Sequence, residues 1–134
     1  MARLYKNIRA YHLAYQFTLD IYDVTDTFPK SERNNLISQL RRAAVSIPLN
    51  IAEGSAKASH KEFTYFLNVA YGSAKEIEVL LSLSYDLGFL NKKEYDQLDN
   101  QLDELNAKLY LFIRSIESRI KSNRYQFFKK FDEK

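Results

Sequence analysis

Polar side chains recur at intervals of three or four residues between positions 35 and 57. They are Asn35, Gln39, Arg42, Ser46, Asn50, Glu53 and Lys57. Side chains with this spacing lie along one line of an α-helix. Because amides and a hydroxyl stand there beside two cations and a carboxylate, the row can form hydrogen bonds and ion pairs. The chemistry it offers is recognition between packed helices.

This polar row lies directly beside an apolar row of the same segment, so we expect it near the interior of a helical bundle or at a boundary between packed units. A counterpart occurs in residues 69–83 as Val69, Gly72, Glu76, Val79 and Leu83, where a glycine permits close approach and a glutamate interrupts an apolar series. A solvated face is the simpler alternative. We expect instead that Arg42, Asn50, Glu53 and Glu76 pair in a layer that fixes helix register, since unpaired buried charges are strongly destabilising. The full set of expected assembly residues is Gln39, Arg42, Ser46, Asn50, Glu53 and Glu76.

Pro48 stands in the middle of this otherwise helix-forming segment, QLRRAAVSIPLNIAEGS. A proline inside a helix removes one N–H group and crowds the carbonyl of residue 44, at a cost of about 3 kcal/mol. We expect a side chain such as that of Ser46 or Asn50 to satisfy the freed carbonyl, and the bend to fit the helix to its neighbours.

Residue types suited to catalysis are scarce. The chain has no cysteine and two histidines, His12 and His60. Neither histidine is part of a Glu-x-x-His pair, so the di-iron pattern of helical bundles is missing, and no base stands beside a nucleophile. The GSAKAS segment lacks the glycine spacing of a phosphate-binding loop. We therefore expect no enzyme, no catalytic residue, no metal, no cofactor and no small-molecule substrate.

The C-terminal region, residues 119–134, offers a second kind of chemistry. It carries six Lys/Arg against two Asp/Glu. Cations that neutralise phosphates alternate there with aromatic rings that can stack on bases. An alternative function is therefore binding of RNA or DNA. The residues for that function are Arg41, Lys57, Arg119, Lys121, Arg124, Lys129 and Lys130, and the simpler interpretation is a tail or an extended helix packed on a neighbouring subunit.

Composition and periodicity define the elements that must position these groups. The 134 residues are 46% hydrophobic with only three glycines and two prolines, which favours one domain, residues 1–134, made of a few long helices. Apolar residues at helical spacing predict helices at about 4–27, 32–58, 60–88 and 92–122. Short connections between them favour an all-α, antiparallel up-down-up-down four-helix bundle.

Local signals mark several helix ends. Phe28-Pro29 ends the first helix, and Ser31 is expected to cap the second, whose C-terminal end Gly54 is expected to loosen. Ser59 followed by Glu62 predicts a capping box, and Gly88 a left-handed stop. The first helix has a second apolar face, which agrees with oligomerisation. No apolar run is long enough to cross a membrane and no signal peptide is evident, so we expect a cytoplasmic protein.

The run from Gln39 to Leu90 resembles a known family. Its motifs RRAAxSIPxNIAEG and EFxxFLxxAxGSAxExE resemble those of the four-helix-bundle proteins encoded within intervening sequences of bacterial 23S ribosomal RNA genes, over about residues 7–116. More distantly, the chain is similar to the accessory protein of diversity-generating retroelements.

This resemblance implies an antiparallel four-helix bundle that assembles into a homopentamer, without an assigned chemistry and without making the chain a structural component of the ribosome. The more distant relative is a basic pentamer that binds nucleic acid and a reverse transcriptase. Two interpretations result. The preferred one is a non-enzymatic, homo-oligomeric interaction scaffold, and the alternative is a nucleic-acid-binding accessory protein.

Overall fold

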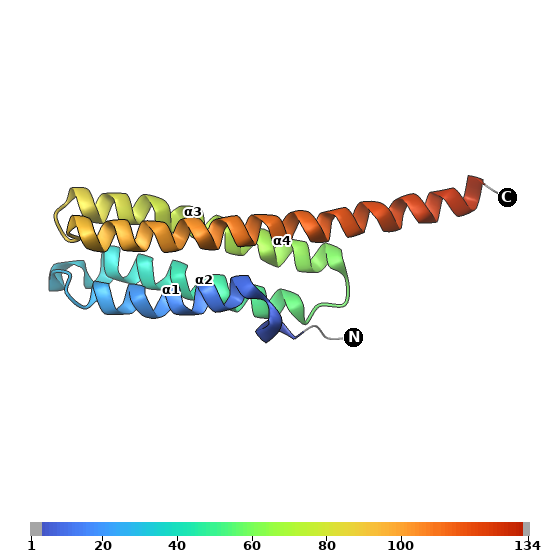
Figure 1. Cartoon of the computed structure of the whole chain (residues 1–134). Coiled ribbons are helices and arrows are strands. Elements are labelled where there is room, and N and C mark those ends of the chain that lie inside the picture. The colour runs from blue at the N-terminus through green and yellow to red at the C-terminus, as the bar shows by residue number, and fades with distance from the viewer. Residues whose placement is uncertain (1–3, 133–134) are drawn as a thin grey trace.

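The computed structural model describes residues 4–132, with side chains described through residue 122. It contains four α-helices: α1 (Arg9–Thr25), α2 (Ser38–Ser55), α3 (His60–Asp86) and α4 (Lys92–Asp132), and no strand occurs among residues 4–132. Each helix packs antiparallel to the next, and α1 also packs on α4, which closes the bundle (Figure 1). The predicted all-α, up-down-up-down four-helix bundle is confirmed.

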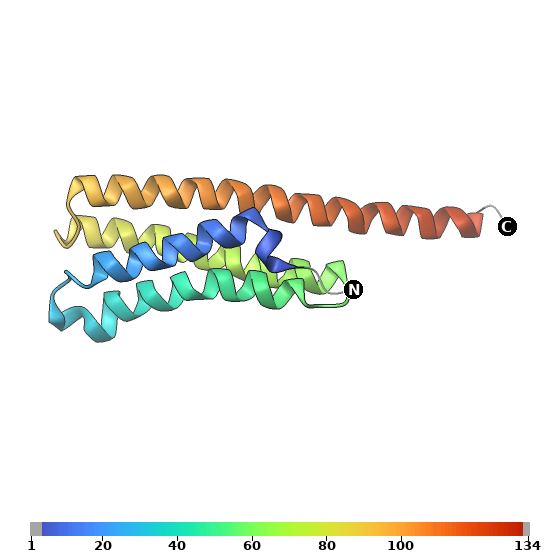
Figure 2. The ribbon, with the colours of Figure 1, turned by 60° about the horizontal axis from the view of Figure 1, so that its bottom comes forward.

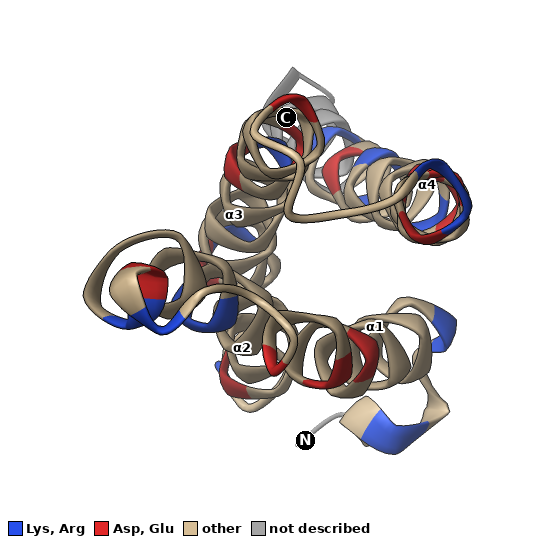
Figure 3. Ribbon diagram, turned by 90° about the vertical axis from the view of Figure 1, so that its left-hand side faces the viewer, with Lys and Arg blue, Asp and Glu red and all other residues tan. Residues whose placement is uncertain are grey.

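The core is built from the apolar rows that periodicity predicts. Each helix contributes side chains that are almost completely buried, and the largest of these are Phe17, Ile21, Leu40, Ile47, Ile51, Phe63, Leu67, Ile77, Leu81, Leu102, Leu105 and Leu109. Viewed from one end, the four helices stand around this core, with α1 and α2 on one side and α3 and α4 on the other (Figure 3). Burial of these rows is the main force that holds the bundle together.

Three helix ends follow the local signals closely. The Ser59 hydroxyl accepts a hydrogen bond from the Glu62 backbone N–H at 3.1 Å, so the predicted cap of α3 is confirmed. A complete capping box starts α4, where Asn91 and Glu94 each accept from the other's N–H. Gly88 has a φ of 82°, and the N–H of Phe89 bonds to the carbonyl of Ser84, which makes a Schellman stop for α3.

The first two helices differ from their predicted bounds of 4–27 and 32–58. Tyr5–Asn7 form a 3₁₀ turn and Ile8 is extended, so α1 starts at Arg9 although the apolar period continues through the turn. Before α2, Lys30–Glu32 form a 3₁₀ turn and Arg33–Ile37 a π-helical turn with a kink at Asn34. Glu32, not the expected Ser31, caps this segment by accepting from the Leu36 N–H.

The fourth helix is longer than expected. It continues to Asp132, beyond the predicted end at residue 122, and has 41 residues against 27 in α3. At about 1.5 Å per residue, the difference is about 20 Å of helix. This C-terminal extension of α4 projects past the end of the bundle where α2 connects to α3 (Figures 1 and 2). Among the described residues, no helix combines the length and the hydrophobicity needed to span a bilayer.

Gly54 has a role in packing that sequence reasoning missed. A Cβ atom at this position would lie 2.7 Å from the Cβ of Phe66 and 2.9 Å from a ring carbon of Phe63, both on α3. Gly54 is buried within α2 and does not loosen its end, contrary to the expectation. It allows α2 and α3 to approach each other closely just before the turn that connects them.

Candidate functional site

Pro48 is accommodated by a side chain from the neighbouring helix. The carbonyl oxygen of Ala44, which lacks its usual N–H partner, lies 3.0 Å from the hydroxyl of Thr18 on α1, and that hydroxyl also lies 2.8 Å from the carbonyl of Ala14. The expectation that Ser46 or Asn50 fills this role is wrong, because both belong to a different contact on the opposite side of α2. The carbonyl that Pro48 leaves without an N–H partner therefore contacts Thr18, and this contact links α2 to α1.

Replacing Thr18 by valine tests this contact. Valine keeps the shape of threonine but removes the donor, which leaves the carbonyl of Ala44 without a partner in a half-buried position. We expect the free energy of unfolding to fall by about 1–2 kcal/mol, measured by urea denaturation. The matched control is Thr27→Val, because the exposed Thr27 hydroxyl bonds only within its own turn, to the carbonyl of Val24. Equal losses in the two variants would contradict the assignment.

Two members of the predicted polar row connect α2 to α3. The amide of Asn50 donates to the carbonyl and to the hydroxyl of Ser46, at 2.7 and 2.9 Å. The Ser46 hydroxyl lies 2.9 Å from that of Ser73 on α3, and, since it accepts from Asn50, it can donate to Ser73. Gln39 donates to Asn35 one turn away. Ser46 and Asn50 are thus brought together as expected, with Ser73 as a partner that α3 periodicity did not indicate.

The three charged residues of the expected paired layer, two from the row and one from its counterpart on α3, lie on the surface of the single chain. Arg42, Glu53 and Glu76 are exposed, and within the part of the chain whose side chains are described none of them forms an ion pair. The row therefore does not lie in the interior of the bundle, which was one of its two expected locations. Because α2 and α3 are antiparallel and Ser46 faces Ser73, Arg42 and Glu76 both lie one turn from that contact, toward the same end of the bundle. Pairing of these charges stays a prediction about contacts between packed units.

A regular apolar row covers the outward side of α3. We call it the α3 outer seam and define it as Tyr65, Val69, Gly72, Glu76, Val79 and Leu83. Its members alternate by four and three residues, they point away from the core, and all are exposed. Val79 keeps 61% of its surface exposed. A Cβ atom at Gly72 would meet nothing within 4 Å, so the expected close approach at this glycine has no partner within the chain.

A second apolar surface lies between α1 and α2. We call it the α1/α2 groove, a hollow of about 410 Å³ lined chiefly by Tyr11, Tyr15, Leu19, Val45, Pro48 and Leu49. Leu49 is 60% exposed and Tyr15 is 53% exposed. Such contiguous apolar patches are uncommon on monomeric proteins and typically mark interaction sites. The groove includes the second apolar face of the first helix, which agreed with oligomerisation at the level of sequence.

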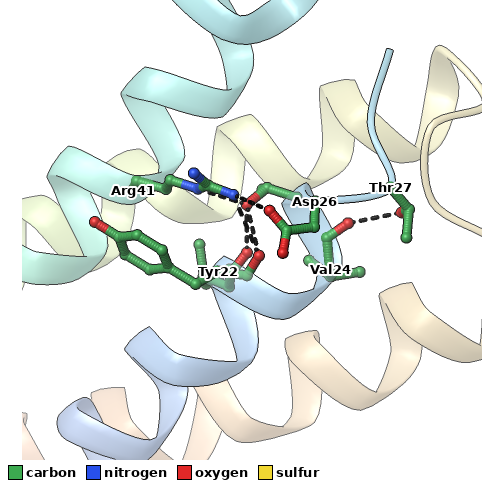
Figure 4. Close-up of polar contacts among 7 residues, drawn as sticks. Tyr22, Val24, Asp26, Thr27 and Arg41 are labelled. Carbon is green, nitrogen blue, oxygen red and sulfur yellow. Dashed lines mark hydrogen bonds and ion pairs between the residues drawn. The ribbon is translucent and has the colours of Figure 1, made fainter. Parts of the chain in front are cut away.

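Arg41, expected as a nucleic-acid contact, is engaged at the end of α1 (Figure 4). Its guanidinium donates to the hydroxyl of Thr25 and the carboxylate of Asp26, both at 2.9 Å, and to the carbonyl of Tyr22 at 3.3 Å. It also lies 4.6 Å from the centre of the Tyr22 ring. This cation lies at the C-terminal end of α1, where the helix dipole favours positive charge, and it is a second donor to the Tyr22 carbonyl, which also accepts from the Asp26 N–H.

The other basic residues are placed differently. Lys57 lies at the turn between α2 and α3, with its ammonium 5.1 Å from the centre of the Phe66 ring, at the opposite end of α2 from Arg41. Arg119 and Lys121 are exposed on the C-terminal extension of α4. The side chains of Arg124, Lys129 and Lys130 lie outside those that the structure describes, although their backbone is helical. Arg41 and the extension are therefore not part of one surface.

The described part of the chain contains no cluster of metal-ligating side chains. No group of three or more His, Cys, Asp or Glu side chains there is arranged to hold a metal ion. His12 is exposed near the start of α1, where its Nε2 contacts the carbonyl of Lys6, and His60 opens α3. Acidic side chains do lie close together along α4, and their repulsion raises the pKa of one of them.

Asp99 shows this effect. Burial raises the pKa of its carboxyl, and the nearby charges of Asp103, Glu78 and Asp96 raise it further. The folded chain therefore holds this proton more tightly than the unfolded chain, so the stability it contributes is complete below pH 3.8 and is lost as the pH rises through the higher folded pKa. We expect Asp99→Asn to raise the Tm slightly at neutral pH and to leave it unchanged in acid, in thermal unfolding followed by circular dichroism. A lower Tm at neutral pH would contradict this.

The fold and these surfaces define an antiparallel four-helix-bundle protein whose exposed polar row and apolar surfaces are suited to contact with other macromolecules. Residues 6–111 match the family model described as 23S rRNA-intervening sequence protein, and the chain belongs to that family.

A solved structure supports the same fold. The crystal structure of a protein of unknown function from the S23 ribosomal protein family of Bacteroides thetaiotaomicron VPI-5482 superposes with a TM-score of 0.74 and 23% sequence identity. The match covers 83% of this chain and 99% of that one. None of the curated proteins matches the chain.

Proposed function

We propose that this protein is a non-enzymatic interaction scaffold that works as a homo-oligomer of four-helix bundles, with five copies as the expected number. The observation that carries the proposal is the exposure of two apolar surfaces on one small chain, the α3 outer seam and the α1/α2 groove. Val79 and Leu49 each keep about three-fifths of their surface exposed. Covering apolar side chains of this size contributes about 1–2 kcal/mol each, which favours association.

Gly72 adds a second argument. A glycine in the middle of a helix costs about 1 kcal/mol relative to alanine. Nothing among the described residues explains the glycine, because the space around it is open. A close approach by another helix would explain it, and the chain itself provides no such helix on that side. A second copy of the chain is the occupant that this proposal assigns.

The polar row gives the assembly its geometry in this proposal. Arg42, Glu53 and Glu76 are exposed and unpaired among the described side chains, whereas Ser46 and Asn50 already fix α2 against α3. Opposite charges at the edge of an apolar contact select one arrangement and disfavour others. We expect Arg42→Met to weaken or alter the assembly while leaving the helical content unchanged. Unchanged assembly would remove Arg42 from this role.

Light scattering coupled to gel filtration tests the proposal directly. The chain has a mass of 15.8 kDa. A scaffold of this kind should elute as a single species with five times that mass, and another small multiple would retain self-association but change the number. A mass equal to that of one chain, at every concentration tested, would overturn the proposal. The number five comes from the resemblance to the family, and the self-association from the exposed surfaces.

Nucleic-acid binding is a second candidate function, favoured by the C-terminal extension of α4. This helix carries Arg119 and Lys121 exposed to solvent and projects beyond the bundle (Figure 1). Fluorescence polarisation with a labelled single-stranded RNA and DNA tests it. Binding through phosphates must weaken steeply as salt concentration rises, and Arg119→Gln with Lys121→Gln should reduce it. Binding that is absent at low salt would exclude this function.

A further inference from the structure

The two apolar surfaces of the chain differ in shape. The α1/α2 groove is a hollow between two helices. Of the residues that line it, Pro48 and Thr18 are half-buried, and Tyr15 and Leu49 are exposed. The α3 outer seam is a single line along one helix, and therefore a ridge. A ridge of side chains packs well into a hollow between two helices. Two grooves facing each other leave both hollows unfilled, and two ridges facing each other leave both grooves uncovered.

The two surfaces also lie on different sides of the bundle. The groove lies between α1 and α2, and the seam consists of exposed residues of α3. In the bundle, α3 stands on the far side of α2 from α1 (Figure 3). A single chain therefore cannot fill its own groove with its own seam. A contact that joins different surfaces of identical chains repeats from copy to copy and closes into a ring when the rotation allows it.

The charges near the two surfaces are complementary. On α2, the exposed Arg42 lies two turns before Leu49, on the same outward side of the helix. On α3, the exposed Glu76 lies one turn after Gly72 within the seam. Neither charge has an ion-pair partner among the described side chains. When a seam lies along a groove, these two unpaired charges of opposite sign come to the same contact, and each supplies what the other lacks.

We propose that the α3 outer seam of one copy packs into the α1/α2 groove of the next copy, with Gly72 receiving the side chain of Leu49 and with Glu76 beside Arg42. This inference rests on the proposed self-association and specifies its contact. Leu49 is 60% exposed where it lines the groove, and a Cβ atom at Gly72 would meet nothing within 4 Å, so the seam has room for a side chain at this position. Every copy then uses both of its apolar surfaces, and no exposed apolar patch of this size remains on either side.

The natural absence of cysteine allows a direct test, because every introduced thiol is the only one in its chain. We would prepare Leu49→Cys and Val69→Cys, which place a thiol in the groove and in the seam. Both changes reduce side-chain volume, so neither blocks the contact. Each variant, and a mixture of the two refolded together from urea, is treated with a short bismaleimide. Asn100→Cys, on the exposed side of α4, replaces Val69→Cys in the matched control mixture.

The expected result is a two-chain product in the mixture of Leu49→Cys and Val69→Cys, and none in either variant alone or in the control mixture. The double variant should give a ladder of products that stops at the number of copies in the ring. A product from Leu49→Cys alone would show groove against groove and overturn the inference. If the natural chain has the mass of an oligomer but the mixture gives no product, the inference fails and the scaffold proposal stands. If the natural protein has the mass of one chain, the inference and the scaffold proposal both fail.

Discussion

Replacing Val79 by arginine should dissociate the assembly without unfolding the chain. Val79 lies in the α3 outer seam and keeps 61% of its surface exposed in the single chain, so a long polar side chain fits there with little effect on stability. In the proposed assembly the same position is covered by a neighbouring copy. A buried, unpaired charge costs about 3 kcal/mol or more, which weakens association by about 100-fold.

Light scattering and circular dichroism together measure this effect. We expect the mass to fall to that of a single chain while the helical spectrum is retained. Asn100→Arg is the matched control, because Asn100 is exposed on α4 outside both apolar surfaces and should leave the assembly intact. An unchanged mass for Val79→Arg would mean that the seam is not covered. Loss of the helical spectrum in this variant would contradict the exposure of Val79 in the chain.

Replacing Gly54 by alanine should be the most destabilising of the single-chain changes considered. The added methyl group would lie 2.7 Å from the Cβ of Phe66 and 2.9 Å from the ring of Phe63, distances at which something must shift. The Cβ of Phe66 is bonded directly to the α3 backbone and the Phe63 ring is completely buried, so neither can move aside as the free end of a flexible side chain could. We expect the free energy of unfolding to fall by about 3 kcal/mol, despite the better helix propensity of alanine.

Urea denaturation measures the loss, and Gly72→Ala provides the comparison. The same added methyl group at Gly72 meets no atom of its own chain within 4 Å, so it should not weaken the fold of the single chain. A similar fall in both variants would show that the contacts with Phe63 and Phe66 are not the cause of the loss, since only Gly54 has them. A neutral Gly54→Ala would mean that α2 and α3 separate readily at this turn.

Periodicity predicted the bundle because burial follows spacing along a helix. On α4, for example, Leu98, Leu102, Leu105 and Leu109 recur at intervals of four and three residues, and all four are buried. The signals for helix ends were also effective where one side chain determines the end, as at Ser59 and Gly88. They failed at the start of α1, because the apolar spacing continues through a 3₁₀ turn that carries no proline or glycine.

Contacts between helices were harder to predict than the helices themselves. The bond from Thr18 to the carbonyl of Ala44 joins residues 26 positions apart, and it depends on how α1 and α2 are placed in space. The role of Gly54 depends likewise on the two aromatic rings of α3. The spacing of the polar row was correct, but spacing alone could not decide between the interior and the surface. The sequence did contain a signal for the role of Thr18. Pro48 leaves a carbonyl that needs a hydrogen-bond donor, and the neighbouring helix carries a threonine.

The rate at which single thiols react with a maleimide tests the central claim most directly. Val79→Cys and Leu49→Cys place thiols in the seam and in the groove, and Asn100→Cys places one on an exposed part of α4. All three positions are open in a single chain, with Val79 at 61% and Leu49 at 60% exposure. If copies cover these surfaces, positions 79 and 49 react much more slowly than position 100, and the three rates become equal in urea. Equal rates in the native protein would show that both surfaces face water, and would contradict assembly through them.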